Sequence, residues 1–82
     1  MRLVIAAPAN GAILKDALKA HLQNDPRVSS LVDLSSPEGT YPQLSFAAAE
    51  EVAAGRADRA LLICGTGVGT AIAANKVRGI RA

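Results

Sequence analysis

The chain has 82 residues and a mass of 8.4 kDa, which is the size of a single domain. Half of its residues are hydrophobic, and nine basic against seven acidic side chains give a formal net charge of +2, a balance too even to indicate nucleic-acid binding. One cysteine and one histidine exclude an internal disulfide and argue against a metal site. No apolar run has the roughly 18 residues that a membrane span needs, and the N-terminus has no apolar stretch of signal-peptide length. We therefore expect a cytoplasmic protein.

Alanine supplies 17 of the 82 residues, and only Tyr41 and Phe46 are aromatic. Such a core buries little area per residue, and a chain of this size buries only about 60% of its unfolded surface. A sheet of three strands would also leave exposed edges. These features predict a homo-oligomer, or a piece of a larger fold.

The first half of the chain predicts a strand, a helix and a second strand. Residues 3–6 form a short apolar run typical of a strand buried on both faces. A helical pattern follows from Ala12 to about residue 22, with Asn10 as a candidate cap and Pro26 beyond its end. Its spacing predicts that Ile13, Leu14, Ala17, Leu18 and Leu22 face inward and that Lys15, Asp16 and Lys19 point away. Residues 31–34 read as the second strand.

The second half repeats this alternation. We expect a loop over residues 35–42, a helix over 43–54 closed by Gly55, a strand over 60–64, a glycine loop over 65–69 and a helix over 70–77, with Gly79 able to close it. Residues 80–82 resemble the opening of a fourth strand. The β-α-β-α-β-α order predicts an α/β fold with a parallel sheet covered on both faces. We expect residues 1–82 to be one domain, the N-terminal portion of a larger one.

The glycine loop concentrates the chemistry of the chain. Cys64 lies at the carboxyl end of the third predicted strand, where ligands of open parallel sheets bind. The glycines let the backbone approach a ligand, and the following helix directs free N–H groups at that place. An anion or a developing oxyanion would be stabilised there, and a cysteine in this field should have a lowered pKa.

Other interpretations of the loop remain open from the pattern alone. Residues 65–69 read GxGxG, which is neither the dinucleotide-binding GxGxxG nor a P-loop. The glycines would also suit a simple tight turn, with Cys64 as an inert buried residue. A generic phosphate- or nucleotide-binding module of the flavodoxin type is a further alternative.

Residues 64–69 (CGTGVG), continued by 72–82 (IAANKVRGIRA), resemble the signature of the RpiB/LacAB sugar-phosphate isomerases, the family of ribose-5-phosphate isomerase B. The similarity extends upstream through residues 55–63, Tyr41-Pro42, Leu14-Lys15 and Gly11. The resemblance implies a three-layer αβα Rossmann-like fold whose five strands are ordered 2-1-3-4-5, so that this chain would hold the 2-1-3 part. It also implies a dimer or tetramer with active sites between subunits.

The family interconverts aldose and ketose phosphates without metal or cofactor. By this resemblance Cys64 is the base that moves a proton between C1 and C2 of a phosphorylated sugar, and Thr66 assists it. The backbone amides of the loop would stabilise the enediolate, which makes Gly65, Gly67 and Gly69 substrate-binding residues. Asn10 and Tyr41 complete the predicted substrate-binding set.

Two departures from the family pattern favour a second hypothesis. Pro8 and Ala9 stand where the family has an acid and a histidine, which leaves Asn10 as the only polar side chain there. The chain also lacks a second half, which in the family supplies a histidine for ring opening and arginines for the phosphate. Arg78 and Arg81 read as solvated charges, and His21 as a surface residue. The alternative is therefore a non-catalytic, truncated or degenerate domain that acts as a scaffold or subunit fragment.

Overall fold

The computed structural model describes residues 1–82, which fold into a three-stranded parallel sheet flanked by helices. In chain order the elements are β1 (Arg2–Ala6), the 3₁₀ helix η1 (Ala9–Gly11), α1 (Ala12–Gln23), β2 (Ser30–Asp33), α2 (Tyr41–Ala53), β3 (Arg59–Leu62) and α3 (Val68–Asn75). The strand order is β2-β1-β3, which confirms the predicted α/β class and its topology. No helix is both long enough and apolar enough to cross a membrane.

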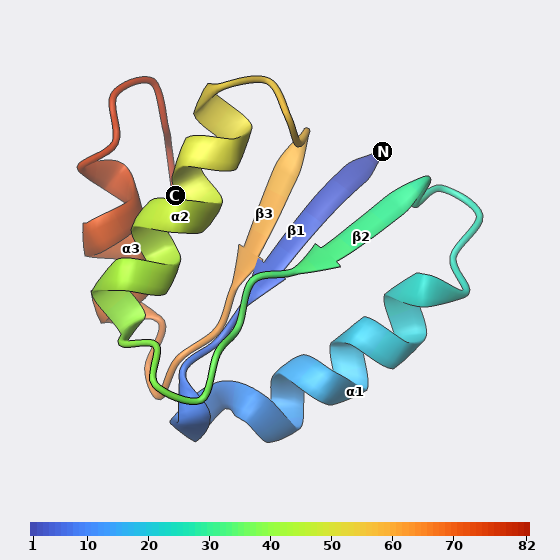
Figure 1. The fold of residues 1–82 in the computed structure, drawn as a ribbon, viewed down its shortest axis with the longest axis horizontal. Helices are drawn as coiled ribbons and strands as arrows, with labels where there is room; N and C mark the ends of the chain where they lie inside the picture. Colours follow the sequence, from blue (N-terminus) through green and yellow to red (C-terminus); the bar gives the residue numbers. More distant parts are fainter.

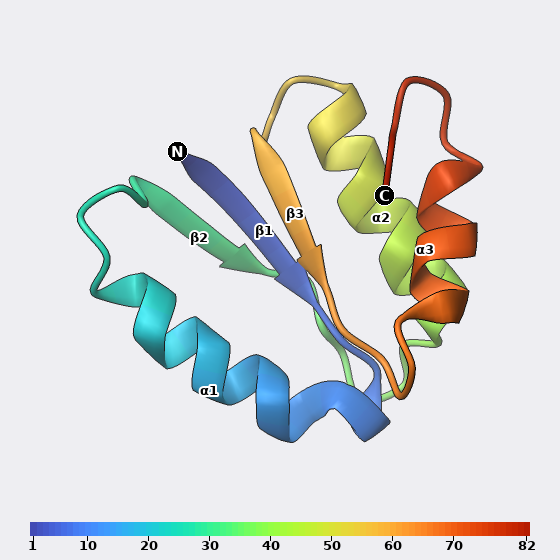
Figure 2. The ribbon, with the colours of Figure 1, turned by 180° about the vertical axis from the view of Figure 1, so that it is seen from behind.

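The sheet lies between two helical layers. Helix α1 covers one face, while α2 and α3 lie side by side over the other (Figures 1 and 2). Strand β1 is central and pairs in parallel with both neighbours, Leu3 opposite Leu31 of β2 and Ile5 opposite Leu61 of β3. Four of its five residues are buried, as expected for a strand covered on both faces.

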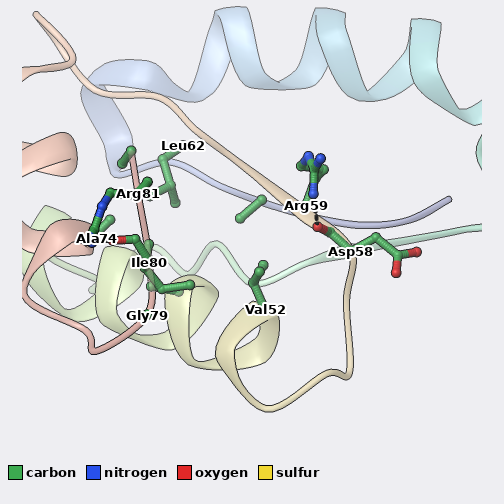
Figure 3. A pocket seen from close by; sticks show the side chains of 11 residues that line it. Val52, Asp58, Arg59, Leu62, Ala74, Gly79, Ile80 and Arg81 are labelled. Carbon is green, nitrogen blue, oxygen red and sulfur yellow. Dashed lines mark hydrogen bonds between the residues drawn. The ribbon is translucent and has the colours of Figure 1, made fainter.

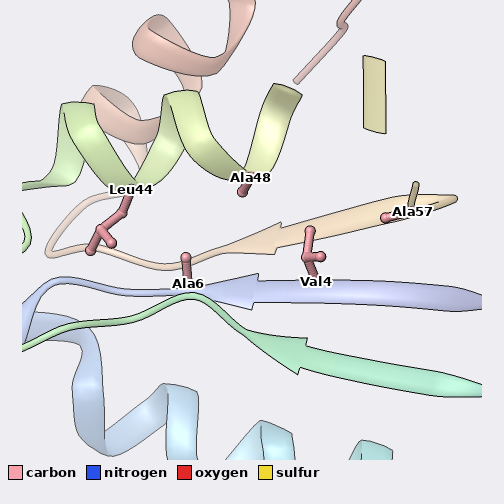
Figure 4. Close-up of a cluster of buried hydrophobic side chains, with 5 residues drawn as sticks. All are labelled: Val4, Ala6, Leu44, Ala48 and Ala57. Carbon is pink, nitrogen blue, oxygen red and sulfur yellow. The ribbon is translucent and has the colours of Figure 1, made fainter. Parts of the chain in front are cut away.

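The layer under α2 forms the larger part of the core. Leu44 and Ala48 point from α2 to the sheet, where Val4 and Ala6 of β1 point toward them, with Ala57 at the far end (Figure 4). The buried face of α2 also carries Ser45 and Ala49, and that of α3 consists of Thr70, Ala73 and Ala74. Because these side chains are small, the two helices can pack closely. The alanine-rich composition therefore serves helix packing rather than large buried area.

The predicted inner face of α1 was right only in part. Leu18 packs against the core and Leu22 is half-buried, as predicted, but Ala17 is exposed. Ile13 is 91% and Leu14 56% exposed, whereas Lys15 is only 9% exposed. The Lys15 ammonium donates to Asp33 at 2.9 Å and to Asp16 at 2.7 Å, and Lys19 also reaches Asp33, at 3.2 Å. The helix is thus rotated so that a lysine meets an acidic residue of β2. Hydrophobic periodicity did not reveal this, because the partner of Lys15 lies 18 residues away.

Several predicted boundaries also change. Helix α2 begins at Tyr41, earlier than predicted, because Pro42 is accepted in the first turn and the Gln43 carboxamide accepts from the Thr40 N–H at 3.3 Å. Helix α3 begins at Val68 and ends at Asn75, since Gly67 with φ +81° turns the chain into it. Gly55, at φ +77°, follows the end of α2 as predicted.

Three further local predictions were wrong. Asn10 makes no capping hydrogen bond to α1; it lies in η1, and Gly11 occupies the N-cap position. Strand β3 ends at Leu62, so Cys64 lies just beyond it, and residues 80–82 form no strand. Instead, the Ala82 N–H donates to the Asn75 side chain at 2.8 Å, and Asn75 donates back to the Ala82 carbonyl at 3.1 Å.

The first testable prediction concerns the buried lysine. Burial alone would raise the pKa of Asp33, but hydrogen bonds from Ser35, Lys15 and Lys19 outweigh it and hold this pKa well below its usual range. Lys15→Met should lower the free energy of unfolding by about 1–3 kcal/mol at neutral pH, because Asp33 loses a buried partner. A carboxylate with a lowered pKa stabilises the fold above its ordinary pKa and stops doing so as the pH falls. The deficit of the variant should therefore shrink toward about pH 3.

Denaturant unfolding at both pH values measures this difference. Lys76→Met is the matched control, because Lys76 is exposed and forms no ion pair. Equal losses in the two variants, or a loss in Lys15→Met that does not change with pH, would contradict the role given to the Lys15–Asp33 pair.

Candidate active site

An open cleft of about 800 Å³ lies at the carboxyl edge of the sheet. Three segments line it: residues 8–10 after β1, Pro37 with residues 39–41 at the start of α2, and the loop and first turns after β3. Helices α1 and α3, which follow β1 and β3, leave the sheet toward opposite faces (Figure 2). In open parallel sheets this divergence of neighbouring strands is where ligands bind.

The cleft brings together most of the residues predicted from the sequence. Its lining includes Cys64, Gly65, Thr66, Gly69, Asn10 and Tyr41. Pro8 and Ala9 also line it. Gly67 is not part of the lining; its amide faces Cys64 instead.

Cys64 is surrounded by uncharged hydrogen-bond donors. Its Sγ accepts the Gly67 N–H at 3.1 Å and lies 3.6 Å from the Thr70 hydroxyl. The Thr70 hydroxyl, followed by the backbone amides of Thr70, Thr66 and Gly67, lowers the pKa of Cys64 to about 7, although partial burial acts in the opposite direction. The predicted direction of this pKa shift is confirmed. A substantial fraction of Cys64 is therefore thiolate at neutral pH, the form that acts as base or nucleophile.

The glycine loop leaves further donors available. Gly67 adopts the left-handed conformation at the start of α3, and the first turn of that helix brings the Thr70 hydroxyl to 3.6 Å from the sulfur. The Thr66 hydroxyl accepts the Val68 N–H at 3.2 Å, so its own hydrogen can be donated elsewhere. The amides of Gly65 and Gly69 have no acceptor within the chain. These groups lie around the thiol at the positive end of α3.

Asn10 and Tyr41 pack against the loop after β3 at two positions that are occupied by glycine. A Cβ atom on Gly65 would lie 3.1 Å from Asn10 Nδ2. One on Gly69 would lie 2.5 Å from Tyr41 Cε1, which is closer than two carbon atoms can pack. The close approach of two polar side chains from other segments thus accounts for glycine at positions 65 and 69.

The remaining polar candidates lie elsewhere. His21 is exposed in the last turn of α1. Arg81 lines a separate cavity of about 470 Å³ between α2, β3 and the C-terminal segment, and donates to the Ile80 carbonyl at 3.0 Å (Figure 3). Nowhere do three His, Cys, Asp or Glu side chains form a group that could hold a metal ion.

Thr70 is the site residue that the sequence analysis missed. It is 4% exposed and faces the same way as Ala73 and Ala74. The spacing i, i+3, i+4 marks one face of a helix, and this signal was present in the sequence. It was missed because the helix was expected to begin at Thr70 itself.

The parallel β2-β1-β3 sheet defines a Rossmann-like α/β protein, and its cysteine–glycine loop lines a cleft at the carboxyl edge of that sheet. A family model described as Ribose/Galactose Isomerase matches residues 3–82, and the chain belongs to this family.

Individual relatives agree with this assignment. The chain is 51% identical to D-erythrulose-4-phosphate isomerase 2 of Mycolicibacterium smegmatis, over all of this chain and 57% of that protein. It is 47% identical to ribose-5-phosphate isomerase B of Escherichia coli, over 88% of this chain and 49% of that protein. The structure of ribose-5-phosphate isomerase B from Clostridium thermocellum superposes with a TM-score of 0.90 at 36% identity, over 99% of this chain and 55% of that one. The chain thus spans about half the length of these relatives.

The second testable prediction concerns the ionisation of Cys64. The rate of its alkylation by iodoacetamide should rise with pH and be half-maximal at about pH 7, because the thiolate is the reacting form. The same chain unfolded in denaturant should show a midpoint near the ordinary value of about 8.5. Intact mass follows the reaction without ambiguity, since Cys64 is the only thiol. Identical midpoints in the folded and unfolded chain would show that the loop does not activate the cysteine.

The third prediction tests the contact between Tyr41 and Gly69. Gly69→Ala should push the ring outward and cost about 1–2 kcal/mol of stability through local overpacking. Tyr41 is the only tyrosine and the chain has no tryptophan, so acrylamide quenching of the intrinsic fluorescence reports this ring alone. Quenching should increase in Gly69→Ala but not in Gly65→Ala, whose new methyl group meets Asn10 instead. The contact is refuted if both variants are quenched like the parent chain.

Proposed function

We propose that this chain carries the catalytic loop of a sugar-phosphate isomerase that interconverts an aldose phosphate and a ketose phosphate. The observation that carries the proposal is Cys64, a thiol with a pKa near 7 among backbone amides at the carboxyl edge of the sheet. Its family membership supports the same reaction class. We further propose that residues 1–82 correspond to the N-terminal portion of one α/β domain, since the chain aligns with 55% of a solved relative.

In the proposed reaction the Cys64 thiolate removes the proton from C2 of the open-chain aldose. The electron pair of the broken C–H bond forms the enediolate, and the thiol then returns the proton to C1 to give the ketose. The hydroxyl proton moves from O2 to O1 in the same conversion. A base whose pKa is close to the working pH suits both steps, because it must accept and then release the same proton.

The negative charge of the enediolate needs donors that are already in place. The free amides of Gly65 and Gly69 at the N-terminus of α3 are the proposed donors. The Thr66 hydroxyl keeps its hydrogen available and is proposed to donate to a substrate oxygen. Gly67 contributes differently, since its amide is used to hold Cys64.

The substrate is proposed to be a phosphorylated sugar whose hydroxyl groups contact Asn10 and Tyr41, the polar side chains that face the loop from the other segments. The 51% identical relative is named for D-erythrulose 4-phosphate, which favours a four-carbon substrate. No charged side chain lines the cleft. We therefore propose that a second subunit helps to bind the phosphate group, in a homo-oligomer with its sites between subunits.

The fourth prediction tests this function. Four- to six-carbon sugar phosphates are incubated with the chain in D₂O, and NMR follows both isomerisation and deuterium incorporation beside the carbonyl group. Cys64→Ala should lower the turnover of the accepted substrate by about 10²–10⁴-fold, the usual contribution of a general base. A native mass spectrum of the same sample records the oligomeric state.

The controls distinguish an active isomerase from a non-catalytic scaffold or fragment. Lys76→Met carries a change of similar size at an exposed residue outside the cleft, and it should keep the parent activity. A well-folded oligomer without turnover or deuterium exchange on any substrate would instead identify the chain as a non-catalytic scaffold or fragment. Turnover that survives in Cys64→Ala would remove Cys64 from the role of base.

A further inference from the structure

Thr70 contacts Cys64 from inside the fold. Its side chain is 4% exposed, on the face of α3 that packs into the protein, and its hydroxyl oxygen lies 3.6 Å from Cys64 Sγ. The same hydroxyl donates to the Gly67 carbonyl at 3.1 Å. A threonine hydroxyl has one hydrogen to donate and can accept at the same time. It can therefore serve only one of its two neighbours as donor.

The protonation state of Cys64 decides which neighbour that is. A protonated thiol can itself donate to the Thr70 oxygen, while Thr70 donates onward to the Gly67 carbonyl. A thiolate has no hydrogen to give and attracts the hydroxyl hydrogen instead. The direction of the Cys64–Thr70 hydrogen bond then reverses.

The Gly67 carbonyl can release Thr70 at little cost. It also accepts the Ala71 N–H at 3.1 Å, the first backbone hydrogen bond of α3. This carbonyl therefore keeps a partner when the hydroxyl turns away, and no buried polar group is left unpaired. The Gly67 amide, meanwhile, donates to Sγ at 3.1 Å through a backbone position that the hydroxyl rotation does not disturb.

We propose that Thr70 is a positioning residue for Cys64. The Thr70 hydroxyl donates to the Gly67 carbonyl when the thiol is protonated, and it turns to Cys64 Sγ when the thiol ionises. The inference rests on the proposed function for its catalytic meaning, but not for its test. The Thr70 hydrogen stays on its oxygen throughout. The proton that Cys64 accepts comes from the substrate carbon and returns to the neighbouring carbon.

Only neutral groups are available near Cys64 to stabilise its thiolate. Tyr41 is the only other titratable side chain that lines the cleft, and no Asp, Glu, His, Lys or Arg faces it. The Thr70 hydroxyl is also the largest cause of the lowered pKa of Cys64. A rotating hydroxyl stabilises the thiolate before proton abstraction and withdraws once the thiol has formed, so the thiol is free to give the proton back.

A purely structural role for Thr70 is the competing explanation. A threonine that donates to the carbonyl three residues earlier is a common local feature of helices. That role would require the Gly67 contact alone, and the ionisation of Cys64 would not depend on the hydroxyl.

The test compares three variants of the 82-residue chain by the pH dependence of Cys64 alkylation and by thiolate absorbance. Thr70→Val keeps the shape and removes the hydroxyl, Thr70→Ala removes it with a better helix former, and Thr70→Ser retains it. The first two should move the midpoint upward by about one pH unit, so that alkylation at neutral pH slows about fivefold. Thr70→Ser should titrate like the parent chain. Circular dichroism verifies that each variant is folded.

Each result decides the question. Upward midpoints in folded Thr70→Val or Thr70→Ala, with the parent midpoint in Thr70→Ser, support the proposal. Parent midpoints in folded variants without the hydroxyl would overturn it and leave Thr70 as a structural residue. The alkylation needs no substrate, so this outcome is independent of whether the chain turns over a sugar phosphate. Where the chain is active, the acidic limb of its pH–rate profile should shift with the alkylation midpoint in Thr70→Val.

Discussion

The close approach of two backbone segments at the carboxyl edge of the sheet is the constraint on which the site depends. A Cβ atom on Gly11 would lie 3.0 Å from the Ile63 carbonyl oxygen, so a larger residue there would press the turn after β1 away from the segment that follows β3. Because β1 and β3 are neighbouring parallel strands, their exits meet at the same edge. Asn10 thereby lies close to Gly65, and the partly exposed Cys64 lines the same cleft.

The lowered pKa of Cys64 follows from hydrogen-bond geometry rather than from a nearby charge. A left-handed glycine redirects the chain so that the first turn of α3 presents amides and one hydroxyl to the sulfur. Neutral donors of this kind lower the pKa without pairing the thiolate with a cation. The sulfur therefore keeps moderate basicity, which agrees with the proposed role of a base that takes a proton and returns it.

The sequence was sufficient for the features that local signals specify. Short apolar runs between helical segments predicted the strands and their parallel pairing, and the family resemblance predicted their order. The glycines after Cys64 marked the edge of the sheet where the cleft lies. The rotation of α1 was not predictable in this way, because it depends on Lys15 meeting Asp33 across 18 residues of chain. Thr70 was missed for a related reason: its importance depends on where α3 begins, and the conformation of Gly67 determines that point.

The buried Lys15–Asp33 pair selects between two rotations of the same helix. A rotation of α1 that buried Ile13 and Leu14 would move the Lys15 ammonium away from the Asp33 carboxylate. Asp33 would then lie without its partner near apolar side chains such as Leu18 and Leu31. The observed rotation satisfies the charges and leaves two aliphatic side chains facing outward. The same carboxylate accepts the Ser35 N–H, and the Ser35 hydroxyl accepts the Ala7 N–H, one residue before the cleft. The Asp33 carboxylate thus fixes both the orientation of α1 and, through Ser35, the path of the chain into the cleft. A substitution in α1 that weakens its contact with Asp33 can therefore alter the position of the cleft residues that follow Ala7.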